Sequence, residues 1–470
     1  MTSLAAKCIR EEPRFYGLRK FDKKICLLSS AADGEELERV RWAGWEDRMS
    51  DCESVYRLEE AVAGYANMEH AVALNGVVTA VHMTVRLAAQ RLYGSSGEVF
   101  TLDSPGMGEA VLTRGMGGSL FGKRAFCPSL APTAAVNSII REGGEPVFID
   151  ASPDDWGMDP QALELAFQKY PDVKLTVFAH LYGFPGQVAR IKEICEGHGA
   201  LLIEDASESP WAKYKGRPTG SFGDYGIFGF GRDKMIKMIG AGSGGVLLTN
   251  DAHGAAKAKK WAAQSGGNAL WSHGGEPGTN CRMSDFAAGA LLGRWRLLEE
   301  RIAGKKRIYD YYANRLEPLG VELNPYDAKD SRPSYWQSCM RLDENSLCLS
   351  EMRGCSRTYR DEHGRTCPLE ILESLEAFSV ESALIFKPMH LQPMCQNYDF
   401  ISVDGGRREY DGRYSGLMER ADESKGLYAK GICLPSDVQM TQEEQERVIE
   451  IIYACFCERN FGRMELEAAR

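Results

Sequence analysis

The sequence predicts an α/β protein whose larger part is a three-layer, mainly parallel sheet, followed by a smaller C-terminal α+β domain. Two observations support this prediction. From about residue 70, short apolar runs alternate with segments of helical period, which is the pattern of βαβ units. The chain also has 470 residues, about three times the length of a typical domain, so two lobes are expected.

The alternation can be followed element by element. Each predicted strand is short and apolar, as is typical of parallel strands buried on both faces, and most are followed by an amphipathic helix. In order, the strands and helices are 71–74 and 77–92, 124–127 and 131–141, 146–149 and 160–170, 174–179 and 188–198, and a strand over 200–203. Right-handed crossovers stack such units into three layers.

The rest of the chain sets the predicted boundaries. A glycine-rich stretch, residues 94–122, is expected to be a long loop. A helical pattern over 297–316 leads into a mixed segment, and the last helix, 442–456, begins after the N-cap residue Thr441. We expect an N-terminal extension over 1–50, a large α/β domain over 51–300 and a small domain over 301–470.

Composition excludes several classes of partner. With 56 basic and 66 acidic residues the net charge is −10, which is unsuited to binding nucleic acid. The sequence contains neither a long apolar run nor a secretory signal, so no contact with a membrane is expected. The 14 cysteines are scattered without a CxxC pair. This spacing predicts reduced thiols in a cytoplasmic protein and no metal site.

Residues 200–250 carry the most informative chemistry. One apolar strand ends in Glu204-Asp205, and Lys234 follows a second apolar strand 29 residues later. Ligands of open parallel sheets bind beyond the carboxyl ends of strands, so both side chains are expected at one crevice. An acid and an amine there suit pyridoxal phosphate, because the lysine forms a Schiff base and the carboxylate keeps the pyridine nitrogen protonated. From these residues alone there is an alternative without a cofactor, in which Asp205 caps a loop and the lysines are exposed to solvent.

Ten short motifs stand in an order that resembles the DegT/DnrJ/StrS-type aminotransferases. They are GGEPVFID (143–150), HLYG (180–183), IED (203–205), YKGR (214–217), GSFGD (220–224), FGF (228–230), GG (244–245), NCRMSD (280–285), HLQP (390–393) and LPS (434–436). The resemblance covers about residues 55–460. It implies a fold-type I pyridoxal-phosphate transferase that aminates a keto-sugar, usually linked to a nucleotide, with glutamate as the amino donor.

The resemblance also assigns site residues. It places Asp205 at the pyridine nitrogen and Glu208 near the phenolic oxygen, where many members carry Gln or His. It places Asn280 at the cofactor phosphate of a neighbouring subunit, which implies a homodimer. His390 falls in the segment that lines the substrate entrance, with a loop histidine of satisfied hydrogen bonds as the alternative. Arg282 either holds a substrate carboxylate or fixes its own loop.

Three positions depart from the family pattern. The phosphate-binding turn, Ser-Gly-Thr in relatives, is Gly76-Val77-Val78 here, and Thr79 or Asn75 is a candidate substitute. Relatives carry a serine, another phosphate ligand, between two aromatic residues, and this chain has Gly229 there. Where relatives carry an aromatic residue that stacks on the cofactor ring, this chain has Pro132. These losses remove about 3–5 kcal/mol of cofactor binding, summed from typical single contributions.

The lysine position is duplicated, because residues 234–239 read KMIKMI. Counted from Phe228 and Phe230 the Schiff-base residue is Lys234, whereas counted back from Gly244 it is Lys237. A slip within a strand moves every side chain to the other face, so the extra triplet is more easily absorbed after the strand. We therefore predict Lys234, with Lys237 as the alternative.

Three functions follow from these observations. The first is an active aminotransferase, supported by the retained acid, lysine and Asn280. The second is a catalytically impaired relative that acts as a partner subunit, in a heterodimer with an active paralogue, supported by the altered phosphate and stacking positions. The third is a changed reaction on the same cofactor, such as elimination.

Overall fold

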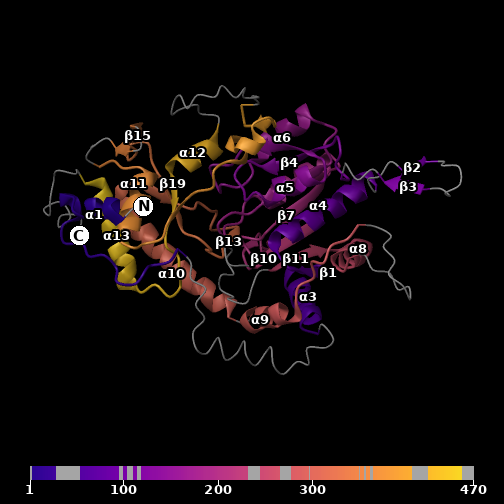
Figure 1. Ribbon diagram of the computed structural model, residues 1–470, viewed down its shortest axis with the longest axis horizontal. Coiled ribbons are helices and arrows are strands. Elements are labelled where there is room, and N and C mark those ends of the chain that lie inside the picture. Colours follow the sequence, from indigo (N-terminus) through magenta and orange to yellow (C-terminus); the bar gives the residue numbers. More distant parts are fainter. Residues whose placement is uncertain are drawn as a thin grey trace.

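The computed structural model describes residues 3–27, 53–94, 99–102, 110–113, 118–230, 244–264, 277–295, 297–348, 350–353, 356–359, 364–404 and 422–457. Two lobes are visible in Figure 1, with the larger sheet on one side and the C-terminal helices on the other. Within the described ranges, every helix is too short or too polar to cross a lipid bilayer.

The large lobe is built on an eight-stranded sheet of order β1-β11-β10-β7-β6-β4-β5-β18. Neighbouring strands are parallel except β11, which runs antiparallel to both β1 and β10. This arrangement confirms the predicted mainly parallel sheet. The strands are β1 (His70–Leu74), β4 (Arg124–Pro128), β5 (Glu145–Ile149), β6 (Leu175–Ala179), β7 (Leu201–Asp205), β10 (Tyr225–Phe230), β11 (Gly244–Thr249) and β18 (Phe400–Ile401).

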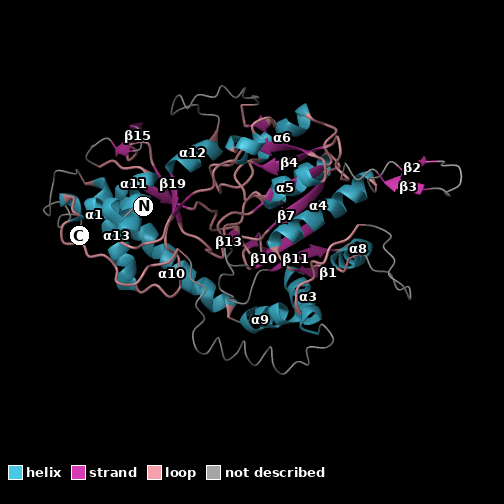
Figure 2. Ribbon diagram, in the orientation of Figure 1, coloured by secondary structure: helices cyan, strands magenta, loops and turns pink. Residues whose placement is uncertain are grey.

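Helices cover both faces of this sheet, as Figure 2 shows. Consecutive residues of β7 point to opposite sides: Ile203 joins the apolar core under α4, α5 and α8, whereas Leu202 joins the core under α6 and α7. Helices α3 and α9 pack against each other beside β1. The helices are α3 (Glu53–Ala66), α4 (Val77–Tyr93), α5 (Ala134–Arg141), α6 (Pro160–Lys169), α7 (Val188–Gly197), α8 (Ala252–Ala262) and α9 (Asp285–Trp295).

Two sequence predictions for this lobe are wrong in part. Helix α5 begins at Ala134 rather than at 131, because Pro132 disfavours helical geometry in the residue before it. The glycine-rich stretch 94–122 is not all loop, since β2 (Val99–Leu102) pairs with β3 (Ala110–Thr113) in an antiparallel hairpin. Both strands are rich in β-branched and apolar residues, which favour this pairing. The hairpin extends away from the lobe in Figure 1.

The C-terminal lobe contains a four-stranded antiparallel sheet of order β12-β14-β19-β17. The N-terminal helices α1 and η1 pack against α11 and α13 of this lobe. The elements are α1 (Ser3–Arg10), η1 (Pro13–Phe15), α10 (Leu298–Leu316), η3 (Glu317–Leu319), β12 (Val321–Leu323), β14 (Cys339–Leu342), α11 (Pro368–Ala377), β17 (Ala383–Leu384), α12 (Glu423–Lys430), β19 (Gly431–Cys433) and α13 (Gln442–Phe456).

Smaller elements complete the chain. They are β8 (Lys213–Tyr214), β9 (Arg217–Pro218), β13 (Ser331–Arg332), the paired strands β15 (Ser350–Arg353) and β16 (Ser356–Tyr359), η4 (Met389–Leu391) and η5 (Pro393–Cys395). The predicted start of α13 is confirmed, because Thr441 and Glu444 form a reciprocal capping box. The Glu444 N–H donates to Thr441 Oγ1 at 3.1 Å, and the Thr441 N–H donates to Glu444 Oε2 at 2.9 Å.

A buried carboxylate fixes the loop that precedes β10. Glu204 Oε1 accepts from the Gly220 N–H at 2.6 Å, and Oε2 accepts from Phe222 and Gly223 at 2.6 and 3.0 Å. His180 Nε2 lies 2.9 Å from Oε1, while its Nδ1 accepts from the Gly186 N–H at 3.1 Å. The proton therefore sits on Nε2, and the imidazole donates to Glu204.

We expect Glu204→Gln to lower the free energy of unfolding by about 2–4 kcal/mol. Whichever way the amide is turned, its NH2 group faces at least two N–H donors, so buried groups lose their partners. Urea denaturation followed by circular dichroism measures the change. Glu193→Gln is the control, because this side chain is 63% exposed and should cost less than about 0.5 kcal/mol. Equal effects would show that the buried network adds nothing.

Candidate active site

Asp205 lies at the carboxyl edge of the sheet, as the last residue of β7. Its neighbours in register are Ala179 on β6 and Ile227 on β10, and only 4% of its surface is exposed. Oδ1 accepts from the Ser207 N–H at 2.9 Å. Among the described residues no further hydrogen bond to this carboxylate is found, so Oδ2 is available to a ligand. A buried carboxylate needs such a partner.

Glu208 is buried three residues farther along. Its Oε2 accepts from the Tyr182 N–H at 3.2 Å, which ties the loop after β7 to the loop after β6. The Tyr182 hydroxyl accepts from the Phe386 N–H at 3.1 Å, and the two rings stack 5.2 Å apart. Burial, with smaller contributions from nearby thiols and from Glu208, raises the pKa of Tyr182 well above its ordinary value. Sequence reasoning did not assign a role to Tyr182, although the HLYG motif contains it.

The start of α4 forms a potential anion site. The first helical bond runs from the Ala80 N–H to the Gly76 carbonyl at 3.0 Å. The N–H groups of Val77, Val78 and Thr79 precede this bond, so the helix itself gives them no acceptor. Thr79 Oγ1 donates to Asn75 Oδ1 at 3.0 Å. The helix terminus therefore offers N–H donors at this turn, while the single hydroxyl proton of Thr79 is held by Asn75.

Gly229 marks the point where three elements of the site converge. A Cβ at this position would lie 2.7 Å from Ser207 Cβ and 2.8 Å from Val77 Cγ2. The start of α4, the loop after Asp205 and strand β10 thus meet around one glycine. The two departures from the family pattern, Val77 and Gly229, are therefore coupled: a larger residue at 229 would collide with Val77.

Both candidate lysines, Lys234 and Lys237, lie outside the described residues, within 231–243. Phe230 at the end of β10 pairs with Gly244 at the start of β11, so the chain leaves and re-enters the sheet at the edge that carries Asp205.

Asn280 and Arg282 are exposed at the same edge of the sheet, beside β1. Their neighbours Cys281 and Met283 are buried, as expected when side chains alternate along an extended segment. The Cys281 carbonyl accepts from the Asn75 N–H at 2.9 Å, which joins this segment to the start of the α4 turn. Strands β11 and β10 separate β1 from β7 in the sheet, so Asn280 and Arg282 are not in contact with Asp205.

His390 lies in η4, between two side chains that sequence reasoning missed. Nδ1 is 2.6 Å from Ser129 Oγ, Nε2 is 3.2 Å from Asp422 Oδ2, and the ring stacks on Phe400 at 4.0 Å. Both ring nitrogens are therefore engaged. Asp422 also caps α12, so the imidazole connects the end of β4 to the start of that helix. No sequence signal joins residues so far apart in the chain.

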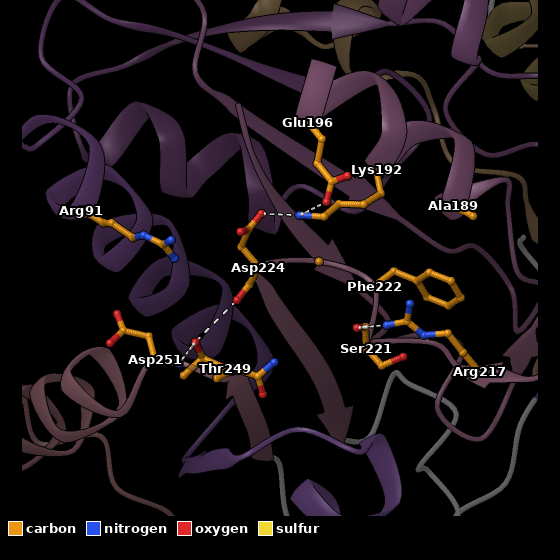
Figure 3. Close-up of a pocket in the computed structure, with 12 residues that line it drawn as sticks. Arg91, Ala189, Lys192, Glu196, Arg217, Ser221, Phe222, Asp224, Thr249 and Asp251 are labelled. Atoms are coloured by element: carbon orange, nitrogen blue, oxygen red, sulfur yellow. Dashed lines mark hydrogen bonds and ion pairs between the residues drawn. The ribbon is translucent and has the colours of Figure 1, made fainter. Parts of the chain in front are cut away.

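A separate hollow of about 880 Å³ lies at the opposite edge of the sheet (Figure 3). It is lined by Asp224, which precedes β10, and by Thr249 at the end of β11. Its charges balance one another, because the lining holds three basic residues (Arg91, Lys192 and Arg217) and three acidic ones (Glu196, Asp224 and Asp251). Lys192 pairs with Asp224 at 2.9 Å and with Glu196 at 3.5 Å. This hollow does not contain any of the predicted site residues.

The residues at the carboxyl edge fit pyridoxal phosphate at two of its polar groups. The buried Asp205 carboxylate has an oxygen available for a protonated ring nitrogen, and the start of α4 offers donors for a phosphate. Glu208 is buried in the loop that follows Asp205. These groups suit a cofactor that carries a protonated ring nitrogen and a phosphate.

Comparison with known proteins places the chain among aminotransferases. Residues 118–453 match the profile of the DegT/DnrJ/EryC1/StrS aminotransferase family. The chain is 33% identical over 341 residues to the putative pyridoxal phosphate-dependent aminotransferase EpsN of Bacillus subtilis, covering 71% of this chain and 78% of that protein. It is 29% identical over 442 residues to the GDP-perosamine synthase of Caulobacter vibrioides, covering 91% and 96%.

Solved structures show the same fold. The putative sugar aminotransferase Spr1654 from Streptococcus pneumoniae, in its PLP form, superposes with a TM-score of 0.70 at 16% identity. The match covers 92% of this chain and 99% of that protein.

We expect Gly229→Ser to destabilise the fold by about 1–3 kcal/mol, because the new side chain overpacks the contact with Val77 and Ser207. Val77→Ala in the same chain should relieve part of this cost. Urea unfolding of the two single variants and the double variant measures the coupling. Strictly additive effects would contradict the packing explanation.

Proposed function

The chain belongs to the DegT/DnrJ/EryC1/StrS aminotransferase family, and on that premise we propose that it is a pyridoxal-phosphate-dependent aminotransferase acting on a keto-sugar. The observation that carries this proposal is the buried Asp205, with one carboxylate oxygen unengaged among the described residues, beside the open start of α4. Pyridoxal phosphate, when bound, supplies the electron sink that allows an amino group to be exchanged.

The residues of the chain have distinct roles in this proposal. Asp205 holds a proton on the ring nitrogen, since its low-dielectric surroundings strengthen a charged hydrogen bond. The N–H groups at the start of α4 bind the phosphate, and the Thr79 hydroxyl proton turns from Asn75 Oδ1 to join them. Glu208 lies beside the phenolic oxygen, with one of its own oxygens held by the Tyr182 N–H.

We assign the cofactor-binding lysine to Lys234, with Lys237 as the alternative. The support is the register of β10, which is paired on both sides: Tyr225 and Ile227 face Ile203 and Asp205 of β7, and Phe230 faces Gly244 of β11. A strand held on both sides resists a slip, so the count from Phe230 should hold. After the cofactor is released from it, the same amine serves as general base for the proton shift.

We propose a nucleotide-linked keto-sugar as amino acceptor and glutamate as donor. The name of one relative, GDP-perosamine synthase, denotes a nucleotide-linked sugar. Arg282 is the candidate for the donor carboxylate, because it is exposed at the site edge. His390 stands near the substrate entrance in this proposal, where it positions a loop through Ser129 and Asp422.

We further propose a homodimer in which Asn280 reaches the cofactor phosphate of the partner. The surface beside Asn280 supports this, since Tyr56 and Phe286 are 56% and 60% exposed on adjoining helices. The two helices are joined by a hydrogen bond from the Val55 N–H to Asp285 Oδ1 at 3.1 Å. Exposed aromatic side chains grouped in this way are typical of protein interfaces.

A second function is favoured by one observation. Gly229 stands where relatives carry a serine ligand of the phosphate, and Val77 stands where they carry a glycine; the packing of Val77 leaves no space to restore a side chain at 229. A subunit that keeps the fold and pairs with an active paralogue would tolerate this loss. Cofactor retention separates the two functions, because a purely structural subunit should not retain pyridoxal phosphate.

The activity is tested by following 2-oxoglutarate release from glutamate with a panel of nucleotide-linked keto-sugars. We expect turnover, and a loss of at least about 100-fold in Asp205→Asn, the size typical of losing a group that controls a proton. Asp224→Asn, at the opposite edge, is the matched control. No turnover with any acceptor, together with no retained cofactor, would favour the structural subunit. Turnover that releases ammonia without 2-oxoglutarate would indicate elimination.

The lysine assignment is tested by borohydride reduction of the cofactor-loaded protein and peptide mapping. We expect the pyridoxyl mass on Lys234, because the paired β10 strand fixes the register up to Phe230. Lys234→Ala should abolish the adduct, whereas Lys237→Ala should only weaken cofactor retention. A pyridoxyl mass on Lys237 would refute the register argument.

The shared site is tested by mixing two inactive variants. Asn280→Ala and the double variant Lys234→Ala/Lys237→Ala damage different parts of one site, so mixed dimers should recover a fraction of activity. Sedimentation should show a dimer of the 52.1 kDa chain. A monomer at micromolar concentration, or no recovery in a confirmed mixed dimer, would contradict the proposal.

A further inference from the structure

Two thiols and a carboxylate meet in the interior of the C-terminal lobe, away from the proposed active site. Cys348, Cys367 and Glu370 are all buried, and their donor atoms lie within 4.8 Å of one another. We propose that Cys348 Sγ, Cys367 Sγ and one oxygen of Glu370 bind a thiophilic divalent cation of the Zn²⁺ type. Two sulfur ligands and one carboxylate select such a cation over Mg²⁺ or Ca²⁺, which prefer oxygen alone.

The backbone brings the three ligands together without help from a metal. Cys367 is the N-cap residue of α11, and Glu370 follows in the first turn, so both face the same side of the helix start. Cys348 arrives through a parallel bridge between Leu347 and Thr366. Its N–H donates to the Thr366 carbonyl at 2.8 Å. The ligand positions are therefore organised before a cation binds.

Glu370 is also oriented by two outer groups. Arg14 Nη1 lies 2.8 Å from Oε1, and Thr366 Oγ1 donates to Oε2 at 3.0 Å. A carboxylate offers about four lone-pair positions, and the metal bond in this proposal uses one of them. Hydrogen bonds of this kind are usual for carboxylates that ligate metals, since they fix the orientation of the ligand.

The charges of the site match a divalent cation. Two thiolates and a carboxylate carry three negative charges. Arg14, which is 3% exposed, contributes one positive charge, and it shares that charge between Glu370 and Glu12, whose Oε2 lies 2.9 Å from Arg14 Nε. The cluster therefore has negative charge to spare for a divalent cation, and buried charge of this kind must be compensated.

Binding would join three parts of the chain. Cys348 and Cys367 flank the β15–β16 hairpin, and Arg14 belongs to the N-terminal segment. Figure 1 places β15 and α11 in the lobe opposite the large sheet. The cation would therefore close the base of the hairpin onto α11, a structural role that does not depend on the proposed catalytic activity. Water completes the fourth tetrahedral position.

The first test is elemental analysis of the full-length protein purified from zinc-supplemented cells and passed over a weak chelating column. We expect about one zinc per chain, and a loss of at least about tenfold in Cys348→Ser and Cys367→Ser. Cys455→Ser is the matched control. This cysteine is equally buried in the same lobe and lies near Arg14 and Glu370, but its thiol donates to the Ile451 carbonyl at 3.3 Å and is not one of the three clustered donors.

The second test uses the wild-type chain alone, so it does not depend on variants that fold. Zn²⁺ added to metal-free protein should protect Cys348 and Cys367 from alkylation, as mapped by mass spectrometry, without protecting Cys339 or Cys433. Co²⁺ should give a thiolate charge-transfer band. A chain that retains no zinc and gives no band would overturn the proposal. So would equal zinc loss in Cys455→Ser, or a Cys348–Cys367 disulfide in the freshly isolated protein.

Discussion

The buried Glu204 carboxylate is the interaction on which the site geometry depends. It collects three backbone N–H groups of the loop 220–223 and the imidazole of His180. That loop precedes β10, and β10 leads to the segment that contains both candidate lysines. Glu204 and Asp205 are consecutive residues at the end of β7. The first holds the loop 220–223, and the second places its carboxylate in the candidate site. Loss of the Glu204 carboxylate would therefore weaken both the end of β7 and the loop that leads into β10.

The site tolerates its departures from the family pattern because they fit one another. Val77 fills the space that a side chain at 229 would need, and Ser207 closes the same space from the loop after Asp205. In the proposed function, phosphate recognition then depends mainly on the backbone N–H groups at the start of α4. Backbone donors are insensitive to side-chain identity, so the turn can lose hydroxyls while the helix terminus keeps its attraction for an anion.

The sequence could predict elements whose signal is local. Parallel strands are apolar throughout, so β5, β6 and β7 fall close to their predicted bounds, and Asp205 sits at a strand end as expected. The start of α5 was misplaced because the helical period extends through Pro132. The β2–β3 hairpin was missed because its strands are short and lie among glycines.

Contacts between distant residues had no local signal. His390 meets Ser129 across 261 residues and Asp422 across 32. Cys348 meets Cys367 only because a strand bridge aligns them. Tandem duplication also blurred the lysine position, since two identical triplets cannot be told apart by pattern.

The short strand β18 has a consequence for how the chain folds during synthesis. Strand β18 comes from residues 400–401, yet it forms the outer edge of the large sheet. The Phe148 N–H donates to the Asp399 carbonyl at 2.8 Å, and the Asp150 N–H donates to the Ile401 carbonyl at 2.9 Å. During synthesis, β5 therefore waits as an open edge until some 250 further residues have emerged. Such an edge invites pairing with other chains, so the interval before residue 400 is when this protein is most exposed to aggregation.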